Sequence, residues 1–179
     1  MVSNFLQGDA MIAYQNPYFS VKLIENYYSI DFNNEQAIIM TTVEHKNFLF
    51  VKVKRNLLDA STIEFPSGSI NSNESIIDGA LREFREETGI IIKDKTRLKT
   101  CTPLSVMPSR FSQKLNVFSL NVSGNEFLNR KDHDNEIDDV FVLPFKETLK
   151  LINNEEIYVM GTLSLILKYF TTKEIIDAS

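Results

Sequence analysis

Residues 68–90 read GSINSNESIIDGALREFREETGI, and this stretch carries the strongest structural signal in the chain. Its apolar residues recur at three- and four-residue steps, which is the pattern of a helix with one buried face. On that helix Glu83, Glu86 and Glu87 stand at positions i, i+3 and i+4, so their carboxylates share the opposite face. Like charges at this spacing repel one another unless a cation lies among them. Because carboxylate oxygens suit Mg²⁺ or Mn²⁺, we predict a divalent-metal site suited to phosphate chemistry.

The two ends of this helix carry boundary signals. Residues 71–73, NSN, supply N-cap candidates at its start. Gly89 fits the position after the last turn, where a left-handed conformation is usual. Arg82 lies four residues before Glu86 and is placed to brace the acidic face. The alternative reading of the same residues is a solvated acidic helix face with no bound cation.

The stretch resembles a complete Nudix box, G-x5-E-x7-R-E-U-x-E-E-x-G-U, where U is a bulky aliphatic or aromatic residue. Every fixed position of that pattern is occupied between Gly68 and Ile90. The resemblance implies an α/β fold, a Nudix-type α/β/α sandwich with a mixed β-sheet and the box helix against the sheet. It also implies that Glu83 and Glu87 bind Mg²⁺ or Mn²⁺ directly, and that Glu86 joins them directly or through water.

Further roles follow from the same resemblance. The family uses a backbone carbonyl from the loop before the box as a metal ligand, and that carbonyl falls at Ser67. Besides binding metal, Glu83 and Glu86 are candidates for a part in catalysis. The residues expected to shape the motif or to support the ligands are Gly68, Glu74, Arg82 and Gly89.

Length and composition predict one ordinary globular domain. The chain has 179 residues, of which 43% are hydrophobic and 24% charged. We therefore expect a single domain over residues 1–179, in which residues 1–35 form an N-terminal extension. The net charge of −5 argues against a protein that binds nucleic-acid backbones. An anionic small substrate is still compatible with that charge, because bound metal ions invert the local field.

Cysteine usage and hydropathy bear on location. Cys101 is the single cysteine, so the chain has no intrachain disulfide and a reducing compartment is expected. The start of the chain lacks a basic segment followed by an apolar run, and no apolar run is long enough to span a bilayer. We expect a cytoplasmic protein without a membrane partner.

The rest of the chain reads as strands before and after the box helix, with two helices at the end. Expected strands cover residues 21–24, 27–32, 36–43, 48–54, 98–106, 114–122 and 137–143. Residues 36–43 and 48–54 form a hairpin. Expected helices cover residues 144–152 and 163–170, and expected loops cover residues 66–68 and 124–134. This order favours a mixed sheet covered by helices.

Segments just before the box resemble the ADP-ribose and nucleotide-sugar branch of the family. Residues 64–68, EFPSG, resemble the E-L-P-A-G of that branch, which makes Glu64 a substrate-binding candidate or an ordinary acid at a strand end. In that branch the preceding strand often ends in Q-Y-R, with the Arg near the substrate. Here residues 53–55 read VKR, so the Gln is lost. Arg55 is a substrate-binding candidate or an exposed base.

Two further segments resemble the same branch. Residues 16–18, NPY, resemble an N-P-W/Y motif whose segment helps to build a dimer and contacts the neighbour's substrate. Tyr18 is therefore a substrate-binding candidate in a homodimer. The other reading is a buried aromatic beside a plain turn, and the two readings are compatible. Arg110 lies in a stretch where the branch carries substrate-contacting loops, and its planar guanidinium suits a phosphate. The alternative is a solvated Arg. An acidic residue usual in ADP-ribose pyrophosphatases is replaced by Gln113 and Lys114, which departs from that substrate.

The second acidic cluster lies in residues 132–139, DHDNEIDD. The same branch places a catalytic glutamate in this loop, often within E-x-I-E-V, and residues 136–140 read EIDDV. We predict Glu136 as the general base and Asp139 as the second choice. The alternative is an acidic loop that is only solvated.

These residues together predict an enzyme that cleaves a pyrophosphate. Metal ions neutralise the phosphate charge and acidify a water, and a carboxylate removes the proton of that water. The expected substrate is a small nucleoside diphosphate linked to another group, as in ADP-ribose or a nucleotide sugar. Alternatives are a hydrolase of nucleoside triphosphates or dinucleoside polyphosphates, and a non-catalytic nucleotide sensor. Sensor domains often lose box glutamates, whereas this box keeps every one.

Overall fold

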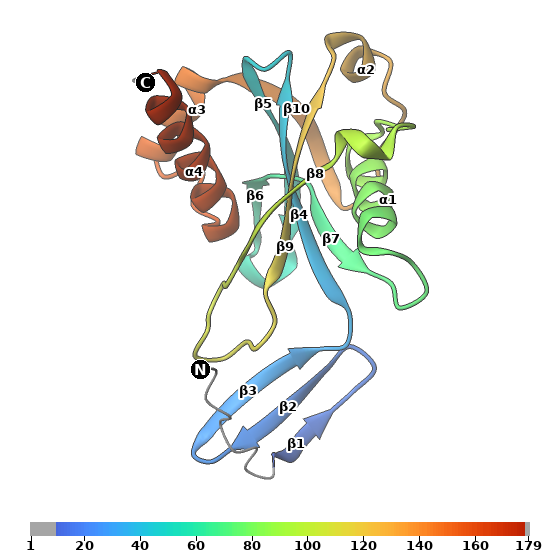
Figure 1. Cartoon of the computed structure of the whole chain (residues 1–179), viewed down its shortest axis with the longest axis vertical. Coiled ribbons are helices and arrows are strands. Elements are labelled where there is room, and N and C mark those ends of the chain that lie inside the picture. The colour runs from blue at the N-terminus through green and yellow to red at the C-terminus, as the bar shows by residue number, and fades with distance from the viewer. Residues whose placement is uncertain (1–9, 178–179) are drawn as a thin grey trace.

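The computed structural model describes residues 10–177, with side chains up to Thr172. A mixed seven-stranded sheet lies between helix α1 on one face and helices α3 and α4 on the other, and a three-stranded sheet stands apart from it (Figure 1). This arrangement confirms the predicted α/β/α sandwich. Residues 1–9 of the expected N-terminal extension lie outside the described part.

The elements have the following bounds. The small sheet consists of β1 (Met11–Gln15), β2 (Phe19–Ile24) and β3 (Tyr27–Phe32). The large sheet consists of β4 (Glu35–Val43), β5 (Asn47–Arg55), β6 (Ala60–Glu64), β7 (Ser67–Ile70), β8 (Lys99–Leu104), β9 (Leu115–Val122) and β10 (Ile137–Pro144). The helices are α1 (Ile76–Thr88), α2 (Gly124–Leu128), α3 (Phe145–Asn153) and α4 (Met160–Asp177), with 3-10 turns η1 (Asn56–Leu58) and η2 (Lys95–Arg97).

At the centre of the large sheet, strands β4 and β5 diverge, and this divergence positions the segment that leads into the box. Strand β4 runs parallel to β9, and β4 and β5 form the predicted hairpin. These two strands pair only beside their turn, after which β7 pairs with β4 and β6 pairs with β5. The link between β6 and β7 is therefore held at the middle of the sheet, where the Ile39 N–H donates to the Pro66 carbonyl at 2.8 Å.

The prediction of a loop over residues 66–68 was wrong in part. Ser67 and Gly68 belong to β7 and lie opposite Ile38 and Ala37 of β4. Their backbone groups find partners in the ladder because β5 has diverged from β4 at this level. Immediately before β7, the Phe65 N–H donates to the Thr162 hydroxyl of α4 at 3.1 Å. The chain that enters the box is thus fixed on both sides.

Helix α1 is the predicted box helix, but its N-cap differs from the prediction. The N-cap is Ser75, whose hydroxyl accepts the Asp78 N–H at 3.1 Å. The expectation of a cap within residues 71–73 was wrong, because that segment forms a turn in which the Glu74 N–H donates to the Asn71 carbonyl. The predicted C-terminal glycine is confirmed, since Gly89 has a φ of 71°.

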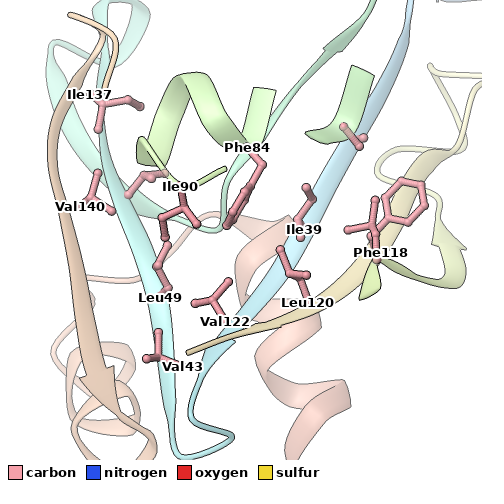
Figure 2. Packing of buried hydrophobic residues seen from close by; sticks show 14 of the residues in the cluster. Ile39, Val43, Leu49, Phe84, Ile90, Phe118, Leu120, Val122, Ile137 and Val140 are labelled. Atoms are coloured by element: carbon pink, nitrogen blue, oxygen red, sulfur yellow. The ribbon is translucent and has the colours of Figure 1, made fainter. Parts of the chain in front are cut away.

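The apolar side of α1 packs on the sheet. Phe84 is fully buried, and Ile90 follows the helix into the same cluster (Figure 2). Around them lie sheet residues such as Leu49, Leu120 and Val140. This packing fixes the rotation of the helix, so its acidic face turns away from the core.

An aromatic cluster fills the other face of the sheet. Phe48 and Phe65 meet edge to face with ring centroids 5.4 Å apart, and Phe145 of α3 lies 4.6 Å from Phe48. Phe65 is fully buried, so it anchors the segment that carries Glu64 and Ser67. None of the helices within residues 10–177 is long and apolar enough to cross a bilayer.

The segment after β9 was predicted as a loop over residues 124–134, and its first part is instead helix α2. Ser123 and Glu126 form a capping box, in which each side chain accepts the backbone N–H of the other. Arg97 pairs with the Glu126 carboxylate at 2.6 Å and holds its pKa down to about 2. Only residues from Asn129 to the start of β10 form a loop.

The loop between β8 and β9 holds the small sheet. The Gln113 side chain accepts the Phe32 N–H at 2.8 Å and donates to the Phe32 carbonyl at 2.6 Å. Phe32 stacks on Phe111, with ring centroids 5.6 Å apart. The Ile30 N–H donates to the Arg110 carbonyl at 2.7 Å. The small sheet is therefore clamped to the sandwich by this loop.

Candidate active site

Glu83 and Glu87 of α1 face strand β7. The Ser67 N–H donates to one Glu87 carboxylate oxygen at 2.8 Å. A Cβ at Gly68 would overlap the Glu83 carboxylate, so any side chain there would displace Glu83 from its present position. The structure therefore brings Ser67 together with three of the predicted box residues, Gly68, Glu83 and Glu87.

Arg82 supplies a positive charge inside the acidic face. Its Nη1 donates to Glu83 and to Glu86, both at 2.9 Å, and its Nη2 donates to Glu74 at 2.7 Å. The pKa of Arg82 is raised mainly by its hydrogen bonds to Glu74, and further by those to Glu83 and Glu86. The hydrogen bond from Arg82 in turn lowers the pKa of Glu74. Arg82 thus neutralises part of the repulsion predicted for the box glutamates.

The electrostatic environment of Glu87 is dominated by burial. Burial is the largest cause that raises its pKa, to about 8, and the charges of Glu83 and Glu64 act in the same direction. The Ser67 N–H and the Arg55 charge oppose this rise. Burial also raises the pKa of Glu83. Two adjacent carboxyl groups that resist ionisation form a site where a bound cation would relieve a large electrostatic cost.

The third box glutamate is engaged elsewhere. Glu86 accepts from Arg82 at 2.9 Å and from Arg85 at 3.1 Å. Among the side chains described, those of residues 10–172, no group of three or more His, Cys, Asp or Glu is arranged to hold a metal ion. The Glu83 and Glu87 carboxylates beside the backbone of Ser67 are oxygen donors that could hold a hard divalent cation.

Arg55 and Glu64, both predicted to bind substrate, bind each other. Arg55 Nε and Nη2 donate to the two Glu64 oxygens at 2.8 and 2.7 Å, in a bidentate pair. Glu64 is only 6% exposed, and Thr62 donates to it at 2.5 Å. The pair is the main cause that raises the pKa of Arg55, with smaller effects from the charges of Glu87 and Glu136. The Arg55 guanidinium is therefore influenced by acidic groups of both the box and the loop before β10.

A cavity of about 540 Å³ opens beside this pair. It combines cationic, acidic and apolar groups. Its lining residues are Lys54, Arg55, Asn56, Leu57, Leu58, Thr62, Glu64 and Val159.

Glu136 lies at the end of the loop that precedes β10. Its side chain is exposed, and its carbonyl accepts the Lys54 N–H at 3.1 Å. Earlier in this loop, the Asp134 N–H donates to the Glu86 carbonyl at 2.9 Å, so the loop lies against the C-terminal end of α1. Asp139, the second choice for the base, is exposed in β10 opposite Lys52.

The structure does not join Arg110 and Tyr18 to this group. Arg110 bonds its guanidinium to the Ser109 carbonyl at 2.8 Å and its backbone to β3. Tyr18 lies in the hairpin turn between β1 and β2 and is 78% exposed. The alternative of a buried aromatic at Tyr18 was therefore wrong. Their positions are the turn between β1 and β2 and the loop that clamps the small sheet.

The sequence analysis missed two contributors. Thr62 stands two residues before Glu64 on the same face of β6, so strand periodicity would have paired them. The Asp134 N–H is a backbone group, and the sequence carries no sign of its bond to Glu86.

Residues 33–160 match the NUDIX domain family. The ADP-ribose pyrophosphatase of Bacillus subtilis (strain 168) is 28% identical over 142 residues, which cover 79% of this chain and 74% of that protein. The ADP-sugar pyrophosphatase of Mus musculus is 30% identical over 117 residues, which cover 63% of this chain and 52% of that protein.

A solved structure shares the fold over nearly the full length. It is a crystal structure of an ADP compounds hydrolase, with a TM-score of 0.68, 19% identity and coverage of 93% of each chain. The family match takes in more than half of this chain and includes the entire box. The chain therefore belongs to the NUDIX domain family and is a Nudix hydrolase, as predicted.

Proposed function

We propose that this chain is a metal-dependent pyrophosphohydrolase of nucleoside diphosphates joined to a second group, of the ADP-ribose or nucleotide-sugar class. Cleavage of the P–O–P link would give a nucleoside monophosphate and a phosphorylated product. The observation that carries this proposal is the pair of half-buried carboxyl groups, Glu83 and Glu87, beside the backbone of Ser67.

A divalent cation, Mg²⁺ or Mn²⁺, fits these donors. Glu83, Glu87 and the Ser67 carbonyl would hold it, and Glu86 would join through water while it stays bonded to Arg82. When bound, such an ion neutralises phosphate charge and acidifies a coordinated water. The chain's own residues would orient the substrate and accept the proton.

Glu136 is the residue we propose to accept that proton. It is exposed to solvent, and its charge acts on Arg55, which in turn lies near Glu87. A carboxylate in this place can accept a proton from a water held at the box. Asp139 is further along β10 and pairs across the sheet, which supports it less.

The proposed substrate class rests on two observations. The relatives in Bacillus subtilis and mouse are named for ADP-ribose and ADP-sugars. The cavity beside Arg55 and Glu64, at about 540 Å³, has the size of small-molecule sites. Arg110 and Tyr18 would take part only if the loop or the small sheet met a substrate held by another copy of the chain.

We also propose a homodimer built through the small sheet. Its strands expose large apolar side chains, including Met11, Ile12, Tyr14 and Tyr27, each more than half exposed. Exposed apolar surface of this kind marks interaction sites. In such a dimer Tyr18 of one copy would face the substrate of the other.

The proposal is tested by a substrate panel with Mg²⁺ and purified protein. The panel contains ADP-ribose, nucleotide sugars, dinucleoside polyphosphates and nucleoside triphosphates, and the assay detects monophosphate-bearing products. We expect one diphosphate conjugate to be turned over well above the rest. Preferred turnover of a triphosphate, or no turnover with Mg²⁺ and Mn²⁺, would contradict the proposal.

A further inference from the structure

We propose that Gly89 is a positioning residue for Glu136, because the C-terminal end of the box helix anchors the loop that carries this glutamate. The inference rests on the proposed function, in which Glu136 is the base. It gives the last glycine of the box a role in catalysis beyond ending the helix.

The anchor uses carbonyl groups at the end of α1. The last carbonyls of any helix lack partners within the helix and must bond elsewhere. Here the Asp134 N–H donates to the Glu86 carbonyl, and the Lys131 N–H donates to the Gly89 carbonyl, both at 2.9 Å. Two backbone bonds, three residues apart, therefore fasten the loop to the box helix.

Gly89 also makes the space for this contact. A Cβ at Gly89 would overlap the carbonyl oxygen of Lys131 and come within 3.0 Å of its nitrogen. The contact is with backbone, so no side-chain rotation can relieve it. Any side chain at Gly89 must push the loop away from the helix.

The loop is held at its other end as well. The Lys54 N–H of β5 donates to the Glu136 carbonyl at 3.1 Å, and the Ile137 N–H donates to the Asp134 carbonyl at 3.1 Å. Asp134 is two residues from Glu136. A shift in the hydrogen bond between the Asp134 N–H and the Glu86 carbonyl would therefore also move Glu136. At the start of the loop, Arg130 lies 4.2 Å above the ring of Phe127.

The test separates the space at Gly89 from its backbone conformation. Asn tolerates a φ of 71° better than Ala, but both add the Cβ that meets Lys131. The variants are Gly89→Asn and Gly89→Ala. Gly161→Ala is the matched control, since its Cβ would come no closer than 3.4 Å to a flexible Ile38 side chain. Activity is measured well below the melting temperature of each variant.

The expected result is a fall in kcat of about 10-fold or more for both Gly89 variants, with KM changed by less than about 3-fold. Combining Gly89→Asn with Glu136→Gln should lower kcat by less than about 3-fold beyond Glu136→Gln alone, because both changes act through one group. Amide exchange at Lys131 and Asp134 should become faster in Gly89→Asn. The Gly161→Ala control should keep its kcat.

Two results would overturn the inference while leaving the proposed function intact. One is a folded Gly89→Asn protein with the wild-type kcat, which would leave Gly89 as only a helix cap. The other is a double variant whose losses multiply, which would mean that Gly89 does not act through Glu136. A wild type that turns over no diphosphate conjugate would instead remove the proposed function, and the positioning role with it.

Discussion

Glu87 links the electrostatics of the box to the stability of the protein. In the unfolded chain its carboxyl titrates near the ordinary value of 4.5, whereas burial raises its pKa to about 8 in the folded, metal-free protein. The folded state therefore binds this proton more tightly. Proton binding by Glu87 therefore stabilises the folded state, fully below the pKa of the unfolded chain. This stabilisation is lost as pH rises through about 8.

The raised pKa of Glu87 predicts that the metal-free protein becomes less stable as pH rises. With EDTA present, wild type should lose stability relative to Glu87→Gln as pH rises from about 5 to about 9, by roughly 1–3 kcal/mol. The reason is that the amide introduced by this substitution does not ionise in this pH range. Thermal unfolding at several pH values measures it, with Glu147→Gln on α3 as the control. Parallel curves for wild type and Glu87→Gln would contradict the assigned burial.

The role of Glu136 is tested by a conservative change within its own loop. Glu136→Gln should reduce kcat by roughly 10²–10⁴-fold while the affinity for Mn²⁺ stays the same, because the base is lost and the metal donors remain. Asp132→Asn removes the same charge from the same loop and should keep near-normal activity. Steady-state kinetics and a metal titration measure both. An unaffected Glu136→Gln rate, with a large loss in Asp139→Asn, would transfer the role to Asp139.

Single residues were predictable where the pattern is local. The spacing of Glu83, Glu86 and Glu87 placed them on one helix face, and the helix confirms it. Sequence could not foresee that Arg82 would bind Glu83, Glu86 and Glu74 together, because that depends on side chains folding back over the turn before the helix. Nor could it show that Arg55 and Glu64 pair, which follows from the β5–β6 ladder.

At the scale of one element, the cap of α1 is a clear case. Ser75→Ala removes the hydroxyl that accepts the Asp78 N–H and should cost about 1 kcal/mol of stability. Ser72→Ala, three residues earlier, is the control and should change stability by no more than about 0.5 kcal/mol, because Ser72 is exposed in the preceding turn. Denaturant unfolding measures both. Equal losses would contradict the assignment of Ser75 as the cap.

Elements were predicted well where their period was strong and less well where a cap or a partner strand decides. The alternating strands and the amphipathic box helix were found. Strand β7 was missed because its four residues become a strand only beside β4. Helix α2 was missed because it is a single short turn fixed by Ser123 and Glu126 in an otherwise polar stretch.

At the scale of the whole molecule, the small sheet exposes large apolar side chains such as Ile12 and Tyr27, and we propose that a second copy covers them. We predict that wild type sediments as a dimer, and that Ile12→Glu shifts it towards monomer by placing a charge in the apolar surface. Gln15→Glu, exposed on the same strand, is the control and should remain dimeric. Sedimentation velocity over a concentration series measures this. A wild-type monomer at every concentration would contradict the proposed dimer.

The overall architecture was predictable because a long, specific motif fixed the family, and hydrophobic periodicity fixed the sheet around it. The separation of β1–β3 into their own sheet was not, since nothing local distinguishes these strands from those of the sandwich. The clamp by Gln113 depends on contacts across 81 positions of the chain.

We propose that this chain hydrolyses the pyrophosphate of a diphosphate conjugate at the box glutamates. The most direct measurement is a phosphorus NMR time course with Mg²⁺ and the preferred conjugate, run with wild type and with Glu87→Gln. With wild type, we predict that the two diphosphate signals of the substrate are replaced by two monophosphate signals. With Glu87→Gln, we predict that the diphosphate signals persist. Persistence of the diphosphate signals with wild type, or equal conversion by both proteins, would contradict the claim.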